Sequence, residues 1–145
     1  MGRKYKRKVL GMDKVIVDTN VIIKYLINDQ PELHKKARDF LDLVKLGKIK
    51  AYIEQTVFTE VIFVLTKLYN IPRDKIKESL HSLLLYRGFH NNEKDILIAS
   101  LNIYVQTNLH IVDCIIATKA RFEGLEIESF DKELLKYSNA TVKEQ

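Results

Sequence analysis

Short apolar runs alternate along this chain with longer stretches in which apolar residues recur at helical spacing. The run Val15-Ile16-Val17 is rich in β-branched side chains and stops at a polar triplet, Asp18-Thr19-Asn20. This pattern is typical of a buried parallel strand that leads directly into a helix. Further strands are predicted at residues 50–54, weakly at residues 88–90, and at residues 125–129.

The segments between these strands predict helices. They are expected over "TNVIIKYLIND", from Pro31 to a stop at Gly47, from Thr56 to about Tyr69, from Pro72 through Leu84, over residues 92–107 with Asn91 or Asn92 as the first cap, and from Asp113 to a stop at Gly124. Strands separated by helices imply parallel pairing with right-handed crossovers. The expected fold class is therefore α/β, a three-layer α/β/α sandwich with a short parallel central sheet.

Length and composition indicate one domain with a substantial core, because the chain has 145 residues and is 46% hydrophobic. We expect a basic N-terminal extension over residues 1–12, a single domain over residues 13–140 and a tail over residues 141–145. The chain shows neither a membrane-spanning apolar run nor a signal peptide, so a cytoplasmic protein is expected. The single cysteine, Cys114, is interpreted as a packed thiol.

The net charge of +5 and the pI of about 9.2 favour a polyanionic partner without identifying one. The densest basic cluster lies near the N-terminus, at Arg3, Lys4, Lys6, Arg7 and Lys8. It could contact a phosphate backbone or serve as a solubilising tail. Met12 is an alternative natural start, because "MDKVIVDTN" would place the first strand at the N-terminus.

Four acidic residues stand in otherwise apolar or small-residue surroundings: Asp18, Glu60, Asp113 and Asp131. Each aspartate could be a helix N-cap. Glu60 fits a structural role less well, because its helix is apolar around most of its circumference and a buried, unpaired carboxylate is costly. Taken together, two of the acids follow strands and two lie in first helical turns, positions that share one edge of a parallel sheet. Converging carboxylates need divalent cations to neutralise them, and oxygen ligands suit Mg²⁺ or Mn²⁺.

Four sequence segments carry a family resemblance: "VIVDTNVIIKYL", "TEVIFVL", "IVDCIIATKA" and "SFDKEL". In order and spacing they resemble the acidic motifs of the PIN domain, from Lys14 to about Tyr137. A single compact domain of this kind is most similar to the VapC toxins of toxin–antitoxin pairs. The resemblance implies a metal-dependent endoribonuclease that leaves 5′-phosphate and 3′-hydroxyl ends, forms a homodimer and binds a cognate antitoxin.

Carried over by position, the resemblance assigns catalysis and metal binding to Asp18, Glu60, Asp113 and Asp131. Asp18 and Asp113 are the expected direct ligands of Mg²⁺ or Mn²⁺, whereas Glu60 and Asp131 would bind a second ion or hold waters. Asn20 and Ser129 become supporting polar groups. The residues proposed to contact RNA phosphates are Lys24, Arg73, Lys119 and Arg121. Those proposed to contact an antitoxin are Tyr25, Leu68 and Tyr69.

Other chemistries fit the sequence less well. The four histidines lack a metal-ligand spacing or a catalytic pairing, and the five glycines form no phosphate-binding loop. An aspartyl-phosphate protein would use Asp18 as nucleophile, but a phosphatase would carry a second aspartate where Asn20 stands. A PIN-like domain that binds RNA or protein without cutting, and a PIN nuclease of RNA processing or quality control, remain alternatives.

Overall fold

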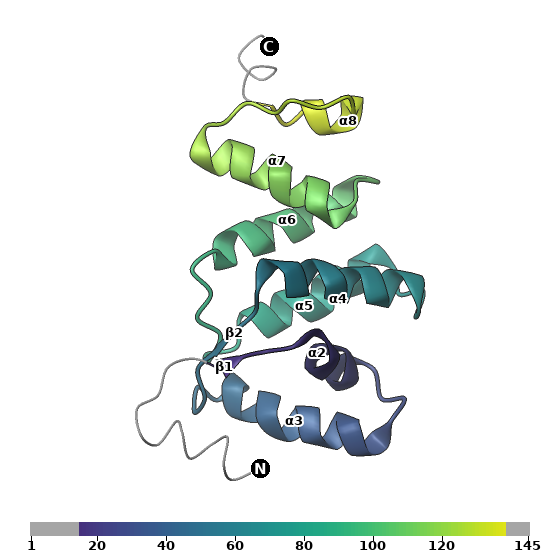
Figure 1. Cartoon of the computed structure of the whole chain (residues 1–145), viewed down its shortest axis with the longest axis vertical. Helices are drawn as coiled ribbons and strands as arrows, with labels where there is room; N and C mark the ends of the chain where they lie inside the picture. The colour runs from purple at the N-terminus through teal and green to yellow at the C-terminus, as the bar shows by residue number, and fades with distance from the viewer. Residues whose placement is uncertain (1–14, 139–145) are drawn as a thin grey trace. The chain divides into compact units, whose positions relative to one another are not determined.

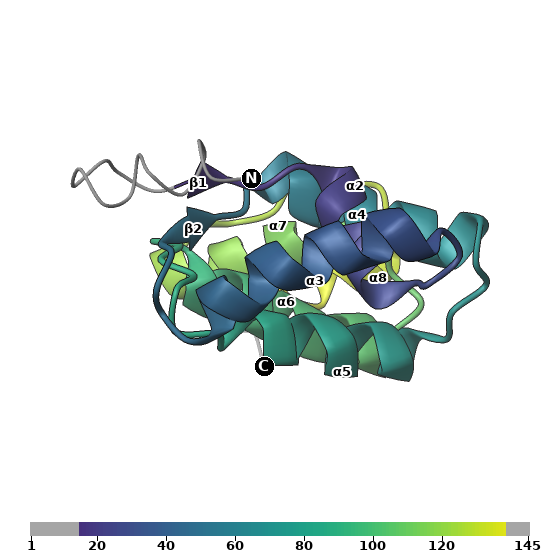
Figure 2. The same ribbon diagram turned by 90° about the horizontal axis from the view of Figure 1, so that it is seen from below.

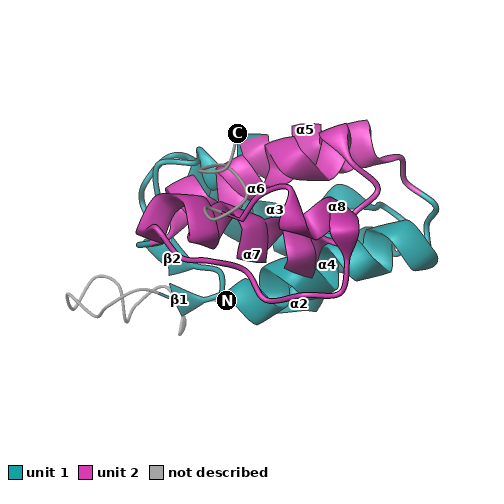
Figure 3. Cartoon of the chain, turned by 90° about the horizontal axis from the view of Figure 1, so that it is seen from above, with its two compact units in different colours: residues 1–70, 82–92 teal, residues 71–81, 93–145 magenta. Residues whose placement is uncertain are grey.

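The computed structural model describes residues 15–138, which divide into two compact units (Figure 3). Among these residues, unit 1 contains residues 15–70 and 82–92, and unit 2 contains residues 71–81 and 93–138. The basic cluster at residues 3–8 and the alternative start at Met12 lie outside the described residues. No helix of the described part is both long and apolar enough to cross a membrane.

Helices dominate both units (Figure 1). Unit 1 contains β1 (Val15–Ile16), α2 (Thr19–Leu26), α3 (Pro31–Lys45), β2 (Ala51–Tyr52) and α4 (Gln55–Lys67). Unit 2 contains α6 (Lys94–Gln106), α7 (Ile111–Glu123) and α8 (Lys132–Leu135). Helix α5 (Arg73–Leu84) has residues 73–81 in unit 2 and its last three in unit 1. The helix predicted from Pro72 through Leu84 is confirmed, and its four apolar residues are all buried: Ile76, Leu80, Leu83 and Leu84.

The sheet of unit 1 is short and parallel. Val15 pairs with Ala51 in the β1–β2 ladder, and the two strands lie side by side in Figure 2. The weakly predicted third strand is present as a single parallel bridge between Ala51 and Phe89. The α/β class with a short parallel sheet is therefore confirmed, although each strand is shorter than its apolar run.

A side chain extends this sheet beyond the third-strand bridge. The Ile53 N–H donates to Oδ1 of Asn91 at 3.1 Å, and Nδ2 of Asn91 donates to the Ile53 carbonyl at 2.6 Å. The amide of Asn91 thus replaces the next backbone pair of the ladder and satisfies both polar groups of a buried residue. Asn91 therefore does not cap α6, although it was one of the two predicted caps. The N-cap position of α6 is occupied by Glu93.

The helices of unit 1 pack around α2, which contacts both α3 and α4. Helix α3 begins with Pro31 at its first turn, where the missing N–H costs nothing. After Lys45 the chain turns at Gly47, whose φ of 79° lies in the left-handed region that favours glycine. The prediction of a stop at Gly47 is confirmed.

Unit 2 is built on the packing of α6 against α7. A buried polar contact joins the two helices, because Ser100 Oγ lies 3.2 Å from Thr118 Oγ1. Each hydroxyl also lies within hydrogen-bond distance of a carbonyl of its own helix, so neither is left unsatisfied. Cys114 is buried as predicted, and burial raises the pKa of its thiol to about 11. Gly124 ends α7 with a φ of 68°, which confirms the predicted stop.

The predicted strand at residues 125–129 is absent from the described structure. Its backbone donors are used locally instead. The Leu125 N–H donates to the Ala120 carbonyl at the end of α7, and the Ile127 N–H donates to Ser138 Oγ at 3.2 Å. The alternation of apolar and acidic residues in "LEIES" suggested a strand, but the helix end and a serine side chain take the donors that a ladder would need.

Candidate active site

The acids of unit 1 are linked by a hydrogen bond between two packed helices. Thr19 is the first residue of α2 and is buried, and its hydroxyl donates to Oε1 of Glu60 on α4, 41 residues further along the chain. Asp18 directly precedes Thr19, at the carboxyl end of β1. The polar triplet that stops the apolar run therefore connects the first acidic motif to the second.

Asp18 occupies the N-cap position of α2 but does not act as a side-chain cap. Its backbone is extended, with φ −82° and ψ 156°, and its carboxylate accepts no capping hydrogen bond from any described residue. The side chain is exposed. The proposed structural explanation for Asp18 is thus not supported, and its carboxylate oxygens stay available to a ligand.

Glu60 has a different environment from the one expected. Helix α4 begins at Gln55, one residue before the predicted start at Thr56, and Glu54 occupies the N-cap position. Glu60 is exposed, even though Val61, Ile62 and Phe58 beside it in the helix are buried. The expected burial cost is therefore avoided, because the carboxylate lies on the solvent side and receives the Thr19 hydroxyl.

Asp113 lies inside α7 and does not cap it. The helix begins two residues earlier, at Ile111, with His110 at the N-cap position. Asp113 is half-buried in the first turn, where free backbone N–H groups make the local field favourable for a carboxylate. The prediction of a first-turn acid holds, whereas the predicted cap is wrong because the helix already starts with the apolar pair Ile111 and Val112.

Asp131 is a true helix cap, as its structural explanation predicted. Its Oδ1 accepts hydrogen bonds from the N–H groups of Glu133 at 2.9 Å and Leu134 at 3.2 Å. The N–H of Asp131 itself donates to Ser129 Oγ at 2.9 Å. Ser129 thus supports the backbone of Asp131, and only Oδ1 of the carboxylate is used by α8.

The donor set suits a hard divalent cation, and its four acids are divided between the two units. Asp18 and Glu60 belong to unit 1, and Asp113 and Asp131 belong to unit 2. Within either unit, the described residues contain no group of three or more acidic, histidine or cysteine side chains placed to hold a metal ion. Carboxylate oxygens are nevertheless the ligands that Mg²⁺ and Mn²⁺ prefer, and those of Asp18 take no part in helix capping.

The cations proposed as phosphate contacts have protein partners. Arg73 is the clearest correction, since its guanidinium donates to four carbonyls and lies 4.0 Å from the ring centroid of Tyr104. Its planar group holds the end of α6 and the loop that follows. The other three have one partner each: Lys24 pairs with Asp29, Lys119 pairs with Glu93, and Arg121 lies over Tyr137.

Two of the three residues proposed to contact an antitoxin already form hydrogen bonds within the chain. Tyr25 exchanges a hydrogen bond with the Tyr86 hydroxyl at an O–O distance of 2.5 Å, and burial and this bond raise its pKa. Tyr69 donates to Oδ2 of Asp29 at 2.8 Å. Leu68 remains 72% exposed and is the member of this group that is open to a partner.

Two residues of the site region were missed by sequence reasoning. Thr19 was overlooked because a threonine at the start of a helix has a routine capping role, and only the packing of α2 on α4 brings it to Glu60. Asn91 was interpreted as a cap because asparagine favours that position. Asn91 instead binds the backbone of Ile53, which leads into α4. The two residues are 38 positions apart, so local sequence does not reveal the contact.

Comparison with protein families supports this arrangement of motifs. The model of the PIN domain matches residues 15–140, which is most of the chain and includes all four acids. No curated protein and no solved structure matches the chain. The chain belongs to the PIN domain family, whose members are generally metal-dependent nucleases that act on RNA.

Proposed function

We propose that this protein is a Mg²⁺- or Mn²⁺-dependent endoribonuclease of the VapC toxin type. The observation that carries the proposal is the bond from Thr19 to Glu60, which ties the acid of the second motif to the triplet that contains Asp18. The ordered family match over residues 15–140 supports the same activity. An antitoxin and a homodimer belong to this proposal, and exposed Leu68 is the residue we assign to the antitoxin contact.

Each acid has a distinct role in the proposed mechanism. Asp18 and Asp113 would bind the metal directly, and Glu60 and Asp131 would hold a second ion or its waters. A bound divalent ion supplies an acidic water and neutralises charge on the phosphoryl group. Thr19 restricts Glu60 to one orientation, and Asn20 and Ser129 act as polar supports around the acids.

The central experiment is cleavage of an end-labelled RNA pool by the purified protein with Mg²⁺, with Mn²⁺ and with excess EDTA. Asp18→Asn and Asp113→Asn are expected to lower the cleavage rate at least about 100-fold, because each removes a charged metal ligand. Matched controls are Glu32→Gln and Asp74→Asn, which neutralise exposed first-turn acids of α3 and α5. Their activity should equal that of the wild type.

Four results would contradict parts of this proposal. Cleavage that persists in EDTA would exclude the metal requirement. Unchanged cleavage by both aspartate variants would show that the site lies elsewhere. RNA binding without cleavage under every metal would favour the non-cutting PIN-like module. Products lacking a 5′-phosphate would also exclude the expected hydrolysis.

The role of Thr19 has its own test. Thr19→Val keeps the shape of the side chain but removes the donor to Glu60, so we expect Mn²⁺ affinity and cleavage to fall about 10-fold or more. Thr19→Ser keeps the hydroxyl and should stay close to the wild type. Mn²⁺ binding is measured by calorimetry, which does not depend on turnover. Equal Mn²⁺ affinity of the valine and serine variants would exclude the positioning role.

A further inference from the structure

Positive charge gathers in unit 1 where the strands begin. Lys50 directly precedes β2, and Arg87 lies two residues before Phe89 of the third-strand bridge. Two more lysines belong to the end of α3 and the turn after it. We call this group the basic edge: Lys45, Lys48, Lys50 and Arg87.

Backbone hydrogen bonds hold these segments together. The Val44 carbonyl accepts from the Gly47 N–H at 3.0 Å and from the Gly88 N–H at 2.7 Å, and the Ala51 N–H donates to the Gly88 carbonyl at 2.7 Å. A Cβ on Gly47 would lie 3.1 Å from Cβ of Arg87, so the arginine side chain starts directly beside this turn. The cations therefore project from segments that are bonded to one another, and their proximity follows from the fold.

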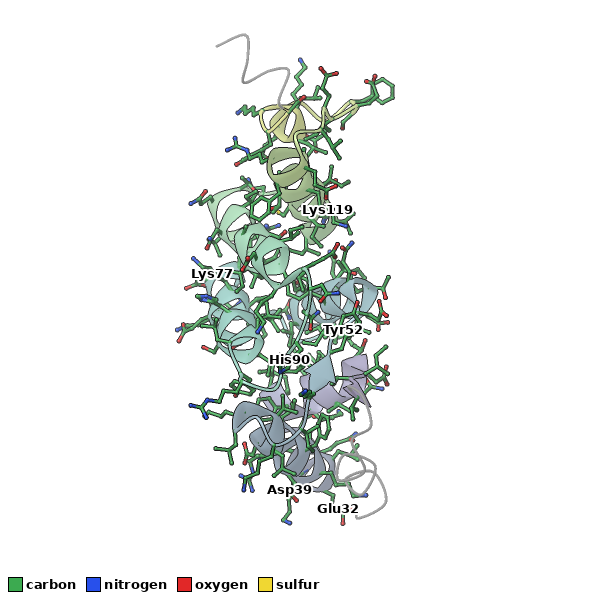
Figure 4. The ribbon with its side chains drawn as sticks, turned by 90° about the vertical axis from the view of Figure 1, so that its left-hand side faces the viewer. Glu32, Asp39, Tyr52, Lys77, His90 and Lys119 are labelled. Carbon is green, nitrogen blue, oxygen red and sulfur yellow. The ribbon has the colours of Figure 1, made fainter. Side chains whose placement is uncertain are left out.

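Two members of the basic edge lack an ion pair in the described part of the chain. Lys48 and Arg87 are exposed, and neither forms an ion pair with a described residue. Lys45 lies 5.6 Å from the ring centroid of Tyr86. Asp42 is the nearest acid along α3, whereas Asp39 of the same helix is paired with Lys35 and, in Figure 4, lies away from Tyr52 and His90 of the sheet. Exposed cations without an ion pair, as Lys48 and Arg87 are, favour an anionic ligand.

The aromatic residue next to these cations is not available for stacking on a base. The Tyr86 ring stacks on Phe89 at 6.4 Å and meets the edge of Tyr25 at 6.3 Å, and its hydroxyl is bonded to Tyr25. The basic edge therefore provides positive charge, but Tyr86 provides no free ring on which an RNA base could stack. Such a surface recognises the phosphate backbone and is insensitive to sequence.

The position of the basic edge in unit 1 relates it to the acids. Because β1 and β2 are parallel, both strands begin at the basic edge, and β1 runs from there toward Asp18. Asp18 follows Val15 by three positions of extended chain, which is about 10 Å. By sequence, Lys14 and the cations at residues 3–8 precede this strand, although they lie outside the described residues.

From these observations we infer that the basic edge binds the phosphates of single-stranded RNA at a site separate from Asp18. This inference rests on the proposed nuclease function, since it assigns a second contact to the same substrate. Its role is to hold the RNA strand, so that affinity comes from one end of the sheet and cleavage from the other. Sequence preference of the enzyme would then arise elsewhere.

The test is fluorescence anisotropy of a labelled, mixed-sequence single-stranded RNA in EDTA, over a range of salt concentrations. The double variant Lys48→Gln/Arg87→Gln should bind about 10-fold more weakly. The slope of log Kd against log salt concentration should decrease by about 1.4, because each lost phosphate contact on a single strand contributes about 0.7. The matched control is Lys36→Gln/Lys67→Gln, which removes two exposed cations from α3 and α4 and should leave both values unchanged.

A charge-retaining variant, Lys48→Arg/Arg87→Lys, separates charge from folding and should bind like the wild type. Equal affinity of the glutamine variant and the wild type would overturn the inference, and so would undetectable RNA binding by the wild type at low salt. An equal loss of polyglutamate binding would assign the surface to acidic proteins and exclude specific use by RNA. Binding in EDTA is independent of cleavage, so a protein that binds RNA here but fails to cut with metal would refute only the proposed function.

Discussion

In each unit, a side chain binds the backbone of the segment that leads into a helix carrying one of the four acids. We call this contact a clamp, and the two units form it with different side chains. In unit 1, the amide of Asn91 binds both backbone groups of Ile53, just before α4 and Glu60. In unit 2, the guanidinium of Arg73 binds the carbonyls at the end of α6 and in the loop before α7 and Asp113. In unit 1, the Asn91 contact continues the backbone hydrogen bonds of the sheet. In unit 2, the segment before α7 is held by the side chain of Arg73.

The comparison shows that the four acids have different structural environments, although each belongs to a similar sequence motif. Asp18 and Glu60 come from elements that pack on each other, and Thr19 connects them directly. In unit 2, Asp131 is committed to capping α8, whereas Asp113 sits within a regular helix. The units should therefore respond differently to the loss of a single interaction.

The largest expected effect is on the ladder of unit 1. A Cβ on Gly88 would meet the Ile49 carbonyl oxygen at 2.1 Å and the Val44 carbonyl oxygen at 2.6 Å, and both contacts are with backbone. Gly88→Ala should therefore lower the free energy of unfolding by about 3 kcal/mol. Urea unfolding followed by circular dichroism measures it. Gly124→Ala is a control without steric contact, limited to left-handed strain at φ 68°. Equal losses for the two variants would show that the close approach is unimportant.

An intermediate effect is expected when the clamp of unit 2 is removed. Arg73→Ala leaves several carbonyls without their charged donor and should cost about 2 kcal/mol. Arg73→Lys keeps the charge but lacks the fork, so it should recover only part of the loss. Amide hydrogen exchange in α6 and α7 should rise in both variants. If exchange rose in α2 and α3 to the same extent, the clamp would not be specific to unit 2.

The smallest effect on stability concerns Asp131 and separates its two roles. Asp131→Ala removes the cap of α8 and should cost about 1 kcal/mol. Asp131→Ser retains a capping oxygen and should unfold like the wild type. If Asp131 also serves the proposed metal site, both variants will lose RNA cleavage although only one loses stability. Full cleavage activity in the serine variant would limit Asp131 to capping.

Sequence patterns predicted the elements better than their ends. The apolar periodicity of α5 and the stops at Gly47 and Gly124 were correct, because each depends on residues close together in the chain. The helix start at Thr56 was one residue late, and the cap at Asp113 was wrong, since a polar residue near a boundary resembles a cap whether or not it binds a backbone N–H. The strand at 125–129 failed for a similar reason, because pairing needs a partner that periodicity does not reveal.

The sequence by itself determined the family and the α/β class, because these are carried by local motifs and by the family match over residues 15–140. The role of the four acids in that match stays a prediction. Only the tertiary structure decided which side chains support them. The contacts of Thr19 with Glu60 and of Asn91 with Ile53 each join residues about 40 positions apart, as does the use of Arg73 as a clamp. Such contacts depend on which faces of the helices pack together, and the one-dimensional pattern leaves many pairings open.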